Sequence, residues 1–255
     1  AGRRKQHTGK PRSGKKGCRR AGFPACPRRS GIVADDMPAP FLYAPPMEPY
    51  LTVLHQDDDL LVLDKQGGLL CVAGKPAEHG DCLEVRAQHA CPQARIVHRL
   101  DRETSGVIVM AMNAKAHRHL GLQFERRKVK KIYIARVWGH VAGESGHIDL
   151  PLACDWPHRP KQKVDMEHGR AAMTGWEVVG REKRATRVRL SPLTGRSHQL
   201  RVHMLNLGHP ILGDSFYATG EARAAADRLQ LHAETLTLHH PADGTLHSFT
   251  APCPF

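Results

Sequence analysis

The chain has 255 residues, of which 40% are hydrophobic and 25% charged, a composition typical of a soluble globular protein. No apolar run approaches the roughly 18 residues that a membrane-spanning helix needs, and the N-terminus lacks the apolar core of a secretory signal. The net charge of +13 comes mostly from residues 1–31, which hold eleven Lys or Arg side chains and no acidic one. The rest of the chain is therefore close to neutral.

Residues 1–48 are rich in Gly, Pro, Ser and Arg and show no apolar periodicity before the segment FLYAPP. Such a segment buries too little apolar surface to offset the entropy of ordering, so we predict a disordered basic arm that binds polyanions without sequence preference. A second interpretation is that translation begins at Met37 or Met47 and the arm is a gene-start artefact. The folded domain is predicted over residues 49–255.

From residue 51 the chain changes to alternating strand and helix patterns. Two short strands, 51–55 and 60–64, flank an acidic turn at residues 57–59. Apolar spacing then predicts a short helix within 82–90, a strand at 107–112 and a helix over 114–126. Further strands are predicted at 130–141, 174–179, 187–191 and 236–239.

A last helix is predicted between Ser197 and Gly208. Ser197 is a typical N-terminal cap, and Leu200, Met204 and Leu207 share one helical face. Gly208 suits the left-handed residue that ends a helix. Strands grouped around a few helices, rather than strict alternation, predict an α+β domain with a mostly antiparallel sheet.

Metal and cofactor motifs are missing from the sequence. The seven cysteines include no C-x-x-C pair, which argues against a zinc ribbon or a thioredoxin-type motif and indicates reduced thiols in a cytoplasmic protein. There is no H-E-x-x-H, and His198 and His203 are five residues apart rather than four. We therefore predict that the protein binds no metal and needs no cofactor.

Asp101 is the strongest candidate for chemistry. In the segment IVHRLDRETSGVIVM it lies between Arg99 and Arg102, and Gly106 allows a tight turn that would leave it on a loop beside the 107–112 strand. An isolated pattern of this kind is compatible with a salt-bridge partner, a metal ligand or a nucleophile. A protein kinase is excluded, because its catalytic loop has Asp directly after His-Arg, whereas the order here is His98-Arg99-Leu100-Asp101. A metal-dependent nuclease would need further carboxylates near Asp101.

The complete string His98-Arg99-Leu100-Asp101-x-x-Thr104-Ser105-Gly106 resembles the signature of RluA-type pseudouridine synthases. KKIYIARVWG is similar to that family's Lys-x-Tyr strand, and TGRSHQLRVHMLNLGHPILGD is similar to its third motif. LPLACDWPHRPKQKV and GDSFYA resemble one branch of the family. These matches span about residues 50 to 255 in the family's order. One departure is Lys65-Gln66-Gly67-Gly68, where the family often has Lys-Pro-x-Gly.

The resemblance implies a pseudouridine synthase fold, in which a mixed, mostly antiparallel sheet with flanking helices forms an RNA-binding cleft. It also implies isomerisation of uridine to pseudouridine, with Asp101 as the catalytic aspartate. Arg201 matches the position that pairs with the aspartate, and Tyr133 matches the active-site tyrosine whose ring stacks on the flipped uracil. Arg99 and Leu100 are expected to support the displaced base.

Basic side chains are expected to bind RNA phosphates. One group is the run at residues 126–131, and further RNA-binding candidates are Arg159, Lys161, Lys163, Arg196 and His198. The branch resemblance implies action on a 23S rRNA hairpin and a tRNA anticodon stem-loop, and we separately expect a monomer. Two alternatives stay open, a synthase acting on only one of these RNAs and an RNA-binding protein without catalysis. No S4 domain is recognisable, because residues 1–48 are too short and too polar.

Overall fold

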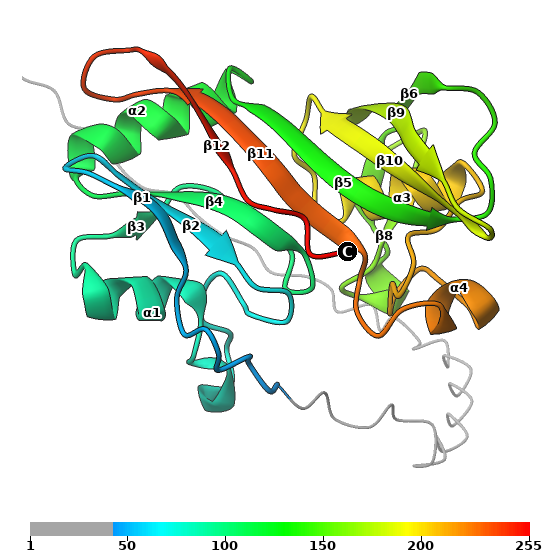
Figure 1. Ribbon diagram of the computed structural model, residues 1–255, viewed down its shortest axis with the longest axis horizontal. Coiled ribbons are helices and arrows are strands. Elements are labelled where there is room, and N and C mark those ends of the chain that lie inside the picture. The colour runs from blue at the N-terminus through cyan, green and yellow to red at the C-terminus, as the bar shows by residue number, and fades with distance from the viewer. Residues whose placement is uncertain (1–42) are drawn as a thin grey trace, which may run out of the picture. The chain divides into compact units, whose positions relative to one another are not determined.

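The computed structural model describes residues 43–255, and the domain that they form is built on one large sheet (Figure 1). The strand order is β1-β2-β4-β11-β5-β10-β9-β6, with β3 paired to β4 and β12 paired to β11. The strands are β1 (Val53–Gln56), β2 (Leu60–Lys65), β3 (Arg95–Ile96), β4 (Ser105–Ala111), β5 (Lys130–Trp138), β6 (Ser145–Asp149), β9 (Met173–Arg181), β10 (Ala185–Pro192), β11 (Leu231–His239) and β12 (Leu246–Thr250).

Four helices and a separate hairpin complete the described part of the chain. The helices are α1 (Leu83–Ala90), α2 (Ala114–Glu125), α3 (Gln199–Asn206) and α4 (Gly220–Ala224), with short 3-10 turns at Ala77–His79 and Trp156–His158. The hairpin pairs β7 (Leu152–Cys154) with β8 (Gln162–Val164). The predicted α+β class and every predicted strand and helix are confirmed. Elements such as β3, β6, β7, β8, β12 and α4 were not predicted, because each is too short to show a clear periodicity.

Strand β4 lies at the centre of the core and is buried along its whole length. One face of the β2–β4 pair packs Leu63 and Ile108 against α1, and the other packs Val62 and Val109 against α2. Because both faces are covered, the segment reads as a continuous apolar run rather than an alternating one. A third cluster, which includes Val137 and Val188, packs β5 and β10 against α3.

Gly106 occupies a different position from the predicted turn. It lies inside β4, with φ of +113°, opposite Ala233 of β11. A Cβ atom at this position would lie 2.1 Å from the carbonyl oxygen of Ala233. Within residues 43–255 this β4–β11 contact is the one parallel pairing of the sheet. Gly106 is therefore required for the close approach of two strands, and the turn prediction is wrong.

The beginning of α3 also differs from the prediction. His198, not Ser197, holds the N-cap position, and its backbone has the left-handed φ of +53° without a side-chain capping hydrogen bond. At the other end, Gly208 has φ of +90°, as predicted for the residue that ends this helix. The acidic turn is confirmed as well, since the Asp57 carboxylate accepts the backbone N–H groups of Asp59 and Leu60 at 2.8 Å.

Most of the predicted basic arm, residues 1–42, lies outside the described residues. Tyr43, which the prediction included in the arm, is buried against the domain. Its hydroxyl donates to the carbonyl of Asp81 at 2.8 Å and accepts the N–H of Leu70 at 3.1 Å. The folded domain therefore includes Tyr43, ahead of the predicted boundary. Within residues 43–255, no helix has the length and apolar character to cross a lipid bilayer.

Candidate active site

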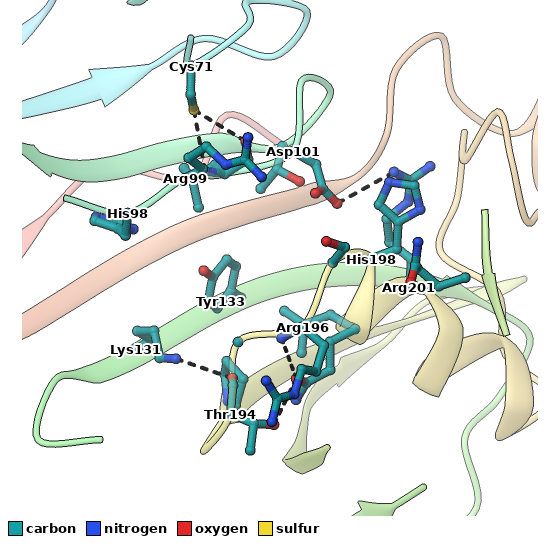
Figure 2. Close-up of a pocket in the computed structure, with 18 of the residues that line it drawn as sticks. Cys71, His98, Arg99, Asp101, Lys131, Tyr133, Thr194, Arg196, His198 and Arg201 are labelled. Atoms are coloured by element: carbon teal, nitrogen blue, oxygen red, sulfur yellow. Dashed lines mark hydrogen bonds and ion pairs between the residues drawn. The ribbon is translucent and has the colours of Figure 1, made fainter. Parts of the chain in front are cut away.

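A cavity of about 900 Å³ opens between the Asp101 loop, strand β5, the β7–β8 hairpin and the N-terminal end of α3. Asp101, Tyr133 and Arg201 all line it, although they are far apart in the sequence. Figure 2 shows these three side chains around one space, with Asp101 turned toward Arg201. The sheet order explains part of the meeting, because β11 lies between β4 and β5, and its Ala233 pairs with Gly106 of β4 on one side and with Tyr133 of β5 on the other.

The backbone of the Asp101 loop is held by a buried ammonium group. Lys65 is fully buried, and its Nζ donates to the carbonyl oxygens of Arg102 at 2.9 Å and Thr104 at 2.8 Å. Burial lowers the pKa of Lys65 to about 8. On the other side of Asp101, the Cys71 thiol donates to the carbonyl of Leu100 and accepts its N–H. These contacts fix the loop on both sides of the carboxylate.

Arg201 binds two carboxylates. Its Nη1 lies 3.6 Å from Oδ2 of Asp101, and its Nε and Nη2 donate to Asp214 at 2.7 and 2.6 Å. Arg201 is 2% exposed, Asp214 is 0% exposed, and the Asp101 side chain is 28% exposed. Burial opposes the charge of Arg201, but the two carboxylates outweigh it and raise its pKa. The arrangement presents one anion to solvent beside a fixed cation.

Asp214 is itself locked in place by the backbone that follows it. Its Oδ1 accepts the N–H groups of Phe216 at 2.9 Å and Tyr217 at 3.1 Å. The Arg201 guanidinium also lies 5.1 Å from the ring centre of each of these aromatic residues. The guanidinium therefore has little rotational freedom, and the direction of its remaining N–H group toward Asp101 is set by the fold.

Tyr133 projects from the centre of β5 and packs against two of the hydrophobic clusters. Burial raises its pKa, and the negative charge of Asp101 adds to the effect, so its hydroxyl stays protonated at neutral pH. The ring thus supplies an apolar face and a neutral hydroxyl to the cavity. A planar base could stack on that face.

Two histidines border the cavity in the neutral form. Burial lowers the pKa of His98 to about 3, and its Nε2 accepts the N–H of Val109 at 3.2 Å while its ring stacks on Phe124. Burial also lowers the pKa of His198, against the opposing effect of Asp101. Nδ1 of His198 lies 2.7 Å from the hydroxyl of Tyr217.

The predicted base-supporting and RNA-binding residues are only partly brought together. Arg99 and Leu100 line the cavity, Arg99 being exposed and Leu100 buried in the core. Cations at the cavity wall are Arg127, Lys131, Arg159 and Arg196. Burial lowers the pKa of Arg196, and the charges of Arg127 and Arg170 add to this, so like charges are crowded at that end. Lys161 and Lys163 are on the hairpin but not at the wall, and Lys163 lies 3.9 Å from Asp165.

Sequence reasoning missed Lys65, Cys71, Asp214 and Tyr217 as parts of the site. Asp214 lies in the quoted segment GDSFYA, but a lone acidic residue thirteen positions after Arg201 carries no local sign of a partner. Lys65 is the last residue of β2 and stands in the segment compared with the family's Lys-Pro-x-Gly, but nothing near it in sequence shows that its side chain is buried. A buried charge of either kind needs a partner, and the partner is visible only in the folded chain.

Comparisons with known proteins agree with this geometry. A family model described as RNA pseudouridylate synthase matches residues 59–206. The chain is 58% identical over 214 residues to the dual-specificity RNA pseudouridine synthase RluA of Escherichia coli (strain K12), covering 84% of this chain and 98% of that relative. The corresponding protein of Yersinia pestis is 55% identical over 206 residues, covering 80% and 100%.

Among solved structures, the human RNA Pseudouridylate Synthase Domain Containing 1 aligns with a TM-score of 0.68 and 28% identity, covering 80% of this chain and 84% of that one. The sequence relatives, the family model and the shared fold lead to the same assignment. The chain belongs to the RNA pseudouridylate synthase family.

Proposed function

We propose that this protein converts specific uridines of RNA to pseudouridine, with Asp101 as the catalytic residue. The observation that carries the proposal is the partly exposed Asp101 carboxylate, held 3.6 Å from a buried guanidinium in an open cavity. A non-catalytic RNA-binding protein on this fold would be expected to lose Asp101 or Arg201, and this chain keeps both.

The reaction breaks the bond between N1 of uracil and C1′ of ribose, turns the base, and joins C5 to C1′ while the C5 hydrogen leaves as a proton and N1 takes up a proton. Asp101 either attacks the nucleoside or assists glycosidic cleavage. Arg201 positions the carboxylate, and the Tyr133 ring stacks on the detached uracil and keeps it from solvent. Because the target base is stacked in RNA, it must first be flipped into the cavity at a cost of a few kcal/mol.

For the RNA substrates, we infer both a 23S rRNA hairpin and a tRNA anticodon stem-loop. The inference is supported by the relatives, which are named dual-specificity RNA pseudouridine synthases and which this chain matches over nearly their whole length. The cations at the cavity wall would contact the phosphates on either side of the flipped nucleotide. The protein would act as a monomer in the cytoplasm. A synthase restricted to one of these RNAs is the remaining alternative.

The variant Asp101→Asn tests the catalytic assignment. The substitution keeps the shape of the side chain and removes its charge, so we expect RNA affinity to stay within a few-fold of the wild type and pseudouridine formation to be abolished. Asp58→Asn is a matched control, because Asp58 is an exposed carboxylate in the β1–β2 turn. Pseudouridine formation by Asp101→Asn would refute the assignment.

A second experiment tests the RNA targets. Modified uridines would be mapped in rRNA and tRNA from cells with and without the protein. Loss of a site from both RNA classes supports the dual assignment. Loss from one class only supports the restricted alternative, and unchanged maps contradict both.

A further inference from the structure

The β7–β8 hairpin carries an aromatic side chain that the proposed reaction does not use. Trp156 is 70% exposed, whereas the chain's other two tryptophans, Trp138 and Trp176, are half-buried. Trp156 lies in the hairpin tip, which we define as residues 155–161 between β7 and β8. The exposed indole ring offers a large, flat surface that a binding partner could cover.

One face of the Trp156 ring is already occupied by a cation. The guanidinium carbon of Arg159 lies 4.6 Å from the ring centre. Arg159 also lines the cavity that contains Asp101, and Pro160 lines it with Arg159. Trp156 is thus joined to the cavity wall through Arg159. A molecule that enters the cavity and continues past its rim would reach the hairpin tip.

The hairpin tip is closed by hydrogen bonds of its own. The Asp155 N–H donates to the carbonyl of Lys161 at 3.0 Å, and the Lys161 N–H donates to the carbonyl of His158 at 3.0 Å. The His158 ring also contacts the Asp155 carboxylate at 2.9 Å. Such bonds favour one conformation of the tip, and a preorganised site loses less entropy on binding.

The base of the hairpin is anchored at the candidate active site. The N–H of Gln162 donates to the hydroxyl of Tyr217 at 2.8 Å, and that hydroxyl contacts His198 at the cavity wall. Leu152 of the hairpin packs against Val202 of α3 in a small buried cluster. The hairpin therefore keeps a fixed position relative to Arg201, which lies on the same helix as Val202.

We propose that Trp156 stacks on an unpaired base of the substrate RNA next to the target uridine. The proposal rests on the proposed function, since it takes the flipped uridine to occupy the cavity. The charge of the tip favours RNA over a protein partner, because Arg159 stacks on the ring, Lys161 is a second cation of the same tip, and the carboxylate of Asp155 is paired with His158. A ring supported by a guanidinium matches a nucleotide, which offers a flat base and a phosphate.

The consequence is that Trp156 contributes to substrate choice. Only an RNA whose flanking nucleotide is unpaired at the distance of the hairpin tip would make this stack. A hairpin loop has such nucleotides and a continuous duplex does not. Because every base has an aromatic face, the contact would select the shape of the loop more than its sequence.

The variants Trp156→Ala and Trp156→Phe test the stack. On stem-loop RNA we expect kcat/KM of Trp156→Ala to fall by about 5- to 150-fold, mostly through KM, since a base–aromatic stack is worth about 1–3 kcal/mol. Trp156→Phe keeps an aromatic ring and should retain most of the activity. Tyr50→Ala is the matched control, because the Arg86 guanidinium also lies 4.6 Å from the Tyr50 ring, but Arg86, unlike Arg159, does not line the cavity.

The partner base is identified with abasic substrates. Each nucleotide flanking the target uridine is replaced in turn by an abasic one. When the abasic site is at the position that stacks on Trp156, kcat/KM of the wild type should fall by the same factor as the Trp156→Ala substitution causes on intact RNA. The wild type and Trp156→Ala should then have equal kcat/KM on this substrate. If Trp156→Ala equals the wild type on intact RNA, or if no abasic position removes the difference between them, the proposal is overturned.

A binding measurement separates this proposal from the proposed function. With Asp101→Asn as background, the tryptophan emission that Trp156→Phe removes should be quenched when stem-loop RNA binds. Quenching supports the stack even if the wild type converts no uridine, a result that would sink the proposed function alone. Absence of quenching on saturating RNA, or equal quenching in Trp156→Phe, overturns the stack and leaves the proposed function intact.

Discussion

The buried pair of Arg201 and Asp214 provides the sharpest test of how the site is built. We predict that Asp214→Asn both destabilises the fold and slows the reaction. In the native site each carboxylate oxygen accepts hydrogen bonds, Oδ2 from Arg201 and Oδ1 from Arg201, Phe216 and Tyr217. An asparagine replaces one oxygen with an N–H₂ group, which turns a donor toward other donors.

The size of the effect follows from burial. With exposures of 2% and 0%, the pair is inaccessible to water, and removing one partner of such a pair costs about 3–5 kcal/mol. Asp101 stays 3.6 Å from Arg201 and compensates part of the charge, so we expect the lower end, about 3 kcal/mol. A domain with the usual stability of about 5–15 kcal/mol would still fold.

Activity should change in a specific way. Asp214 is 0% exposed and cannot touch RNA, so KM should stay within about twofold of the wild type. The guanidinium would no longer be held toward Asp101, and a shift of about 1 Å is enough to reduce kcat by about 100-fold. The rate is measured as release of the C5 hydrogen from tritium-labelled uridine in RNA, and the stability by urea unfolding.

Glu221→Gln is the control, because Glu221 pairs with Arg184 at 2.9 Å in a position that leaves both side chains at least 66% exposed. It should change the free energy of unfolding by less than about 1 kcal/mol. A loss in Asp214→Asn no larger than in this control would refute the burial reasoning. An unchanged kcat would refute the positioning role.

Two further predictions concern the core and the pH dependence. Gly106→Ala should lower the free energy of unfolding by at least about 3 kcal/mol, because its Cβ would clash with Ala233. Gly121→Ala, where nothing lies within 4 Å of the added Cβ, should raise it by up to about 1 kcal/mol. Equal unfolding midpoints of the two variants would contradict this reasoning. Burial lowers the pKa of His98 from 6.5 to about 3. As pH drops below 6.5, the unfolded chain therefore takes up a proton at this histidine before the folded protein does. The free energy of unfolding then falls by about 1.4 kcal/mol per pH unit. His98→Gln should lack this part of the pH dependence. If the stability of the wild type and of His98→Gln fell identically with pH, the prediction would be disproved.

Much of the fold was predictable because it depends on local patterns. The apolar run of β4, the β-branched and aromatic β5 and the helix ended by Gly208 all have periodicities that are visible over a few residues. Short elements such as β7 and β8 could not be predicted, because each is a three-residue strand that forms only when its partner strand is present. The role of Gly106 was missed for a related reason, because the strand that it contacts is more than a hundred residues away.

The family resemblance, the fold class and the candidate set of Asp101, Tyr133 and Arg201 could be predicted without coordinates, because their motifs are contiguous and ordered along the chain. The groups that hold these side chains in place are visible only in the folded protein. Lys65 reaches the carbonyls of the Asp101 loop from another strand, and Asp214 fixes Arg201 from beyond the end of its helix. Buried charges are stable only beside their partners, and those partners come together through the pairing of strands rather than through nearness in sequence.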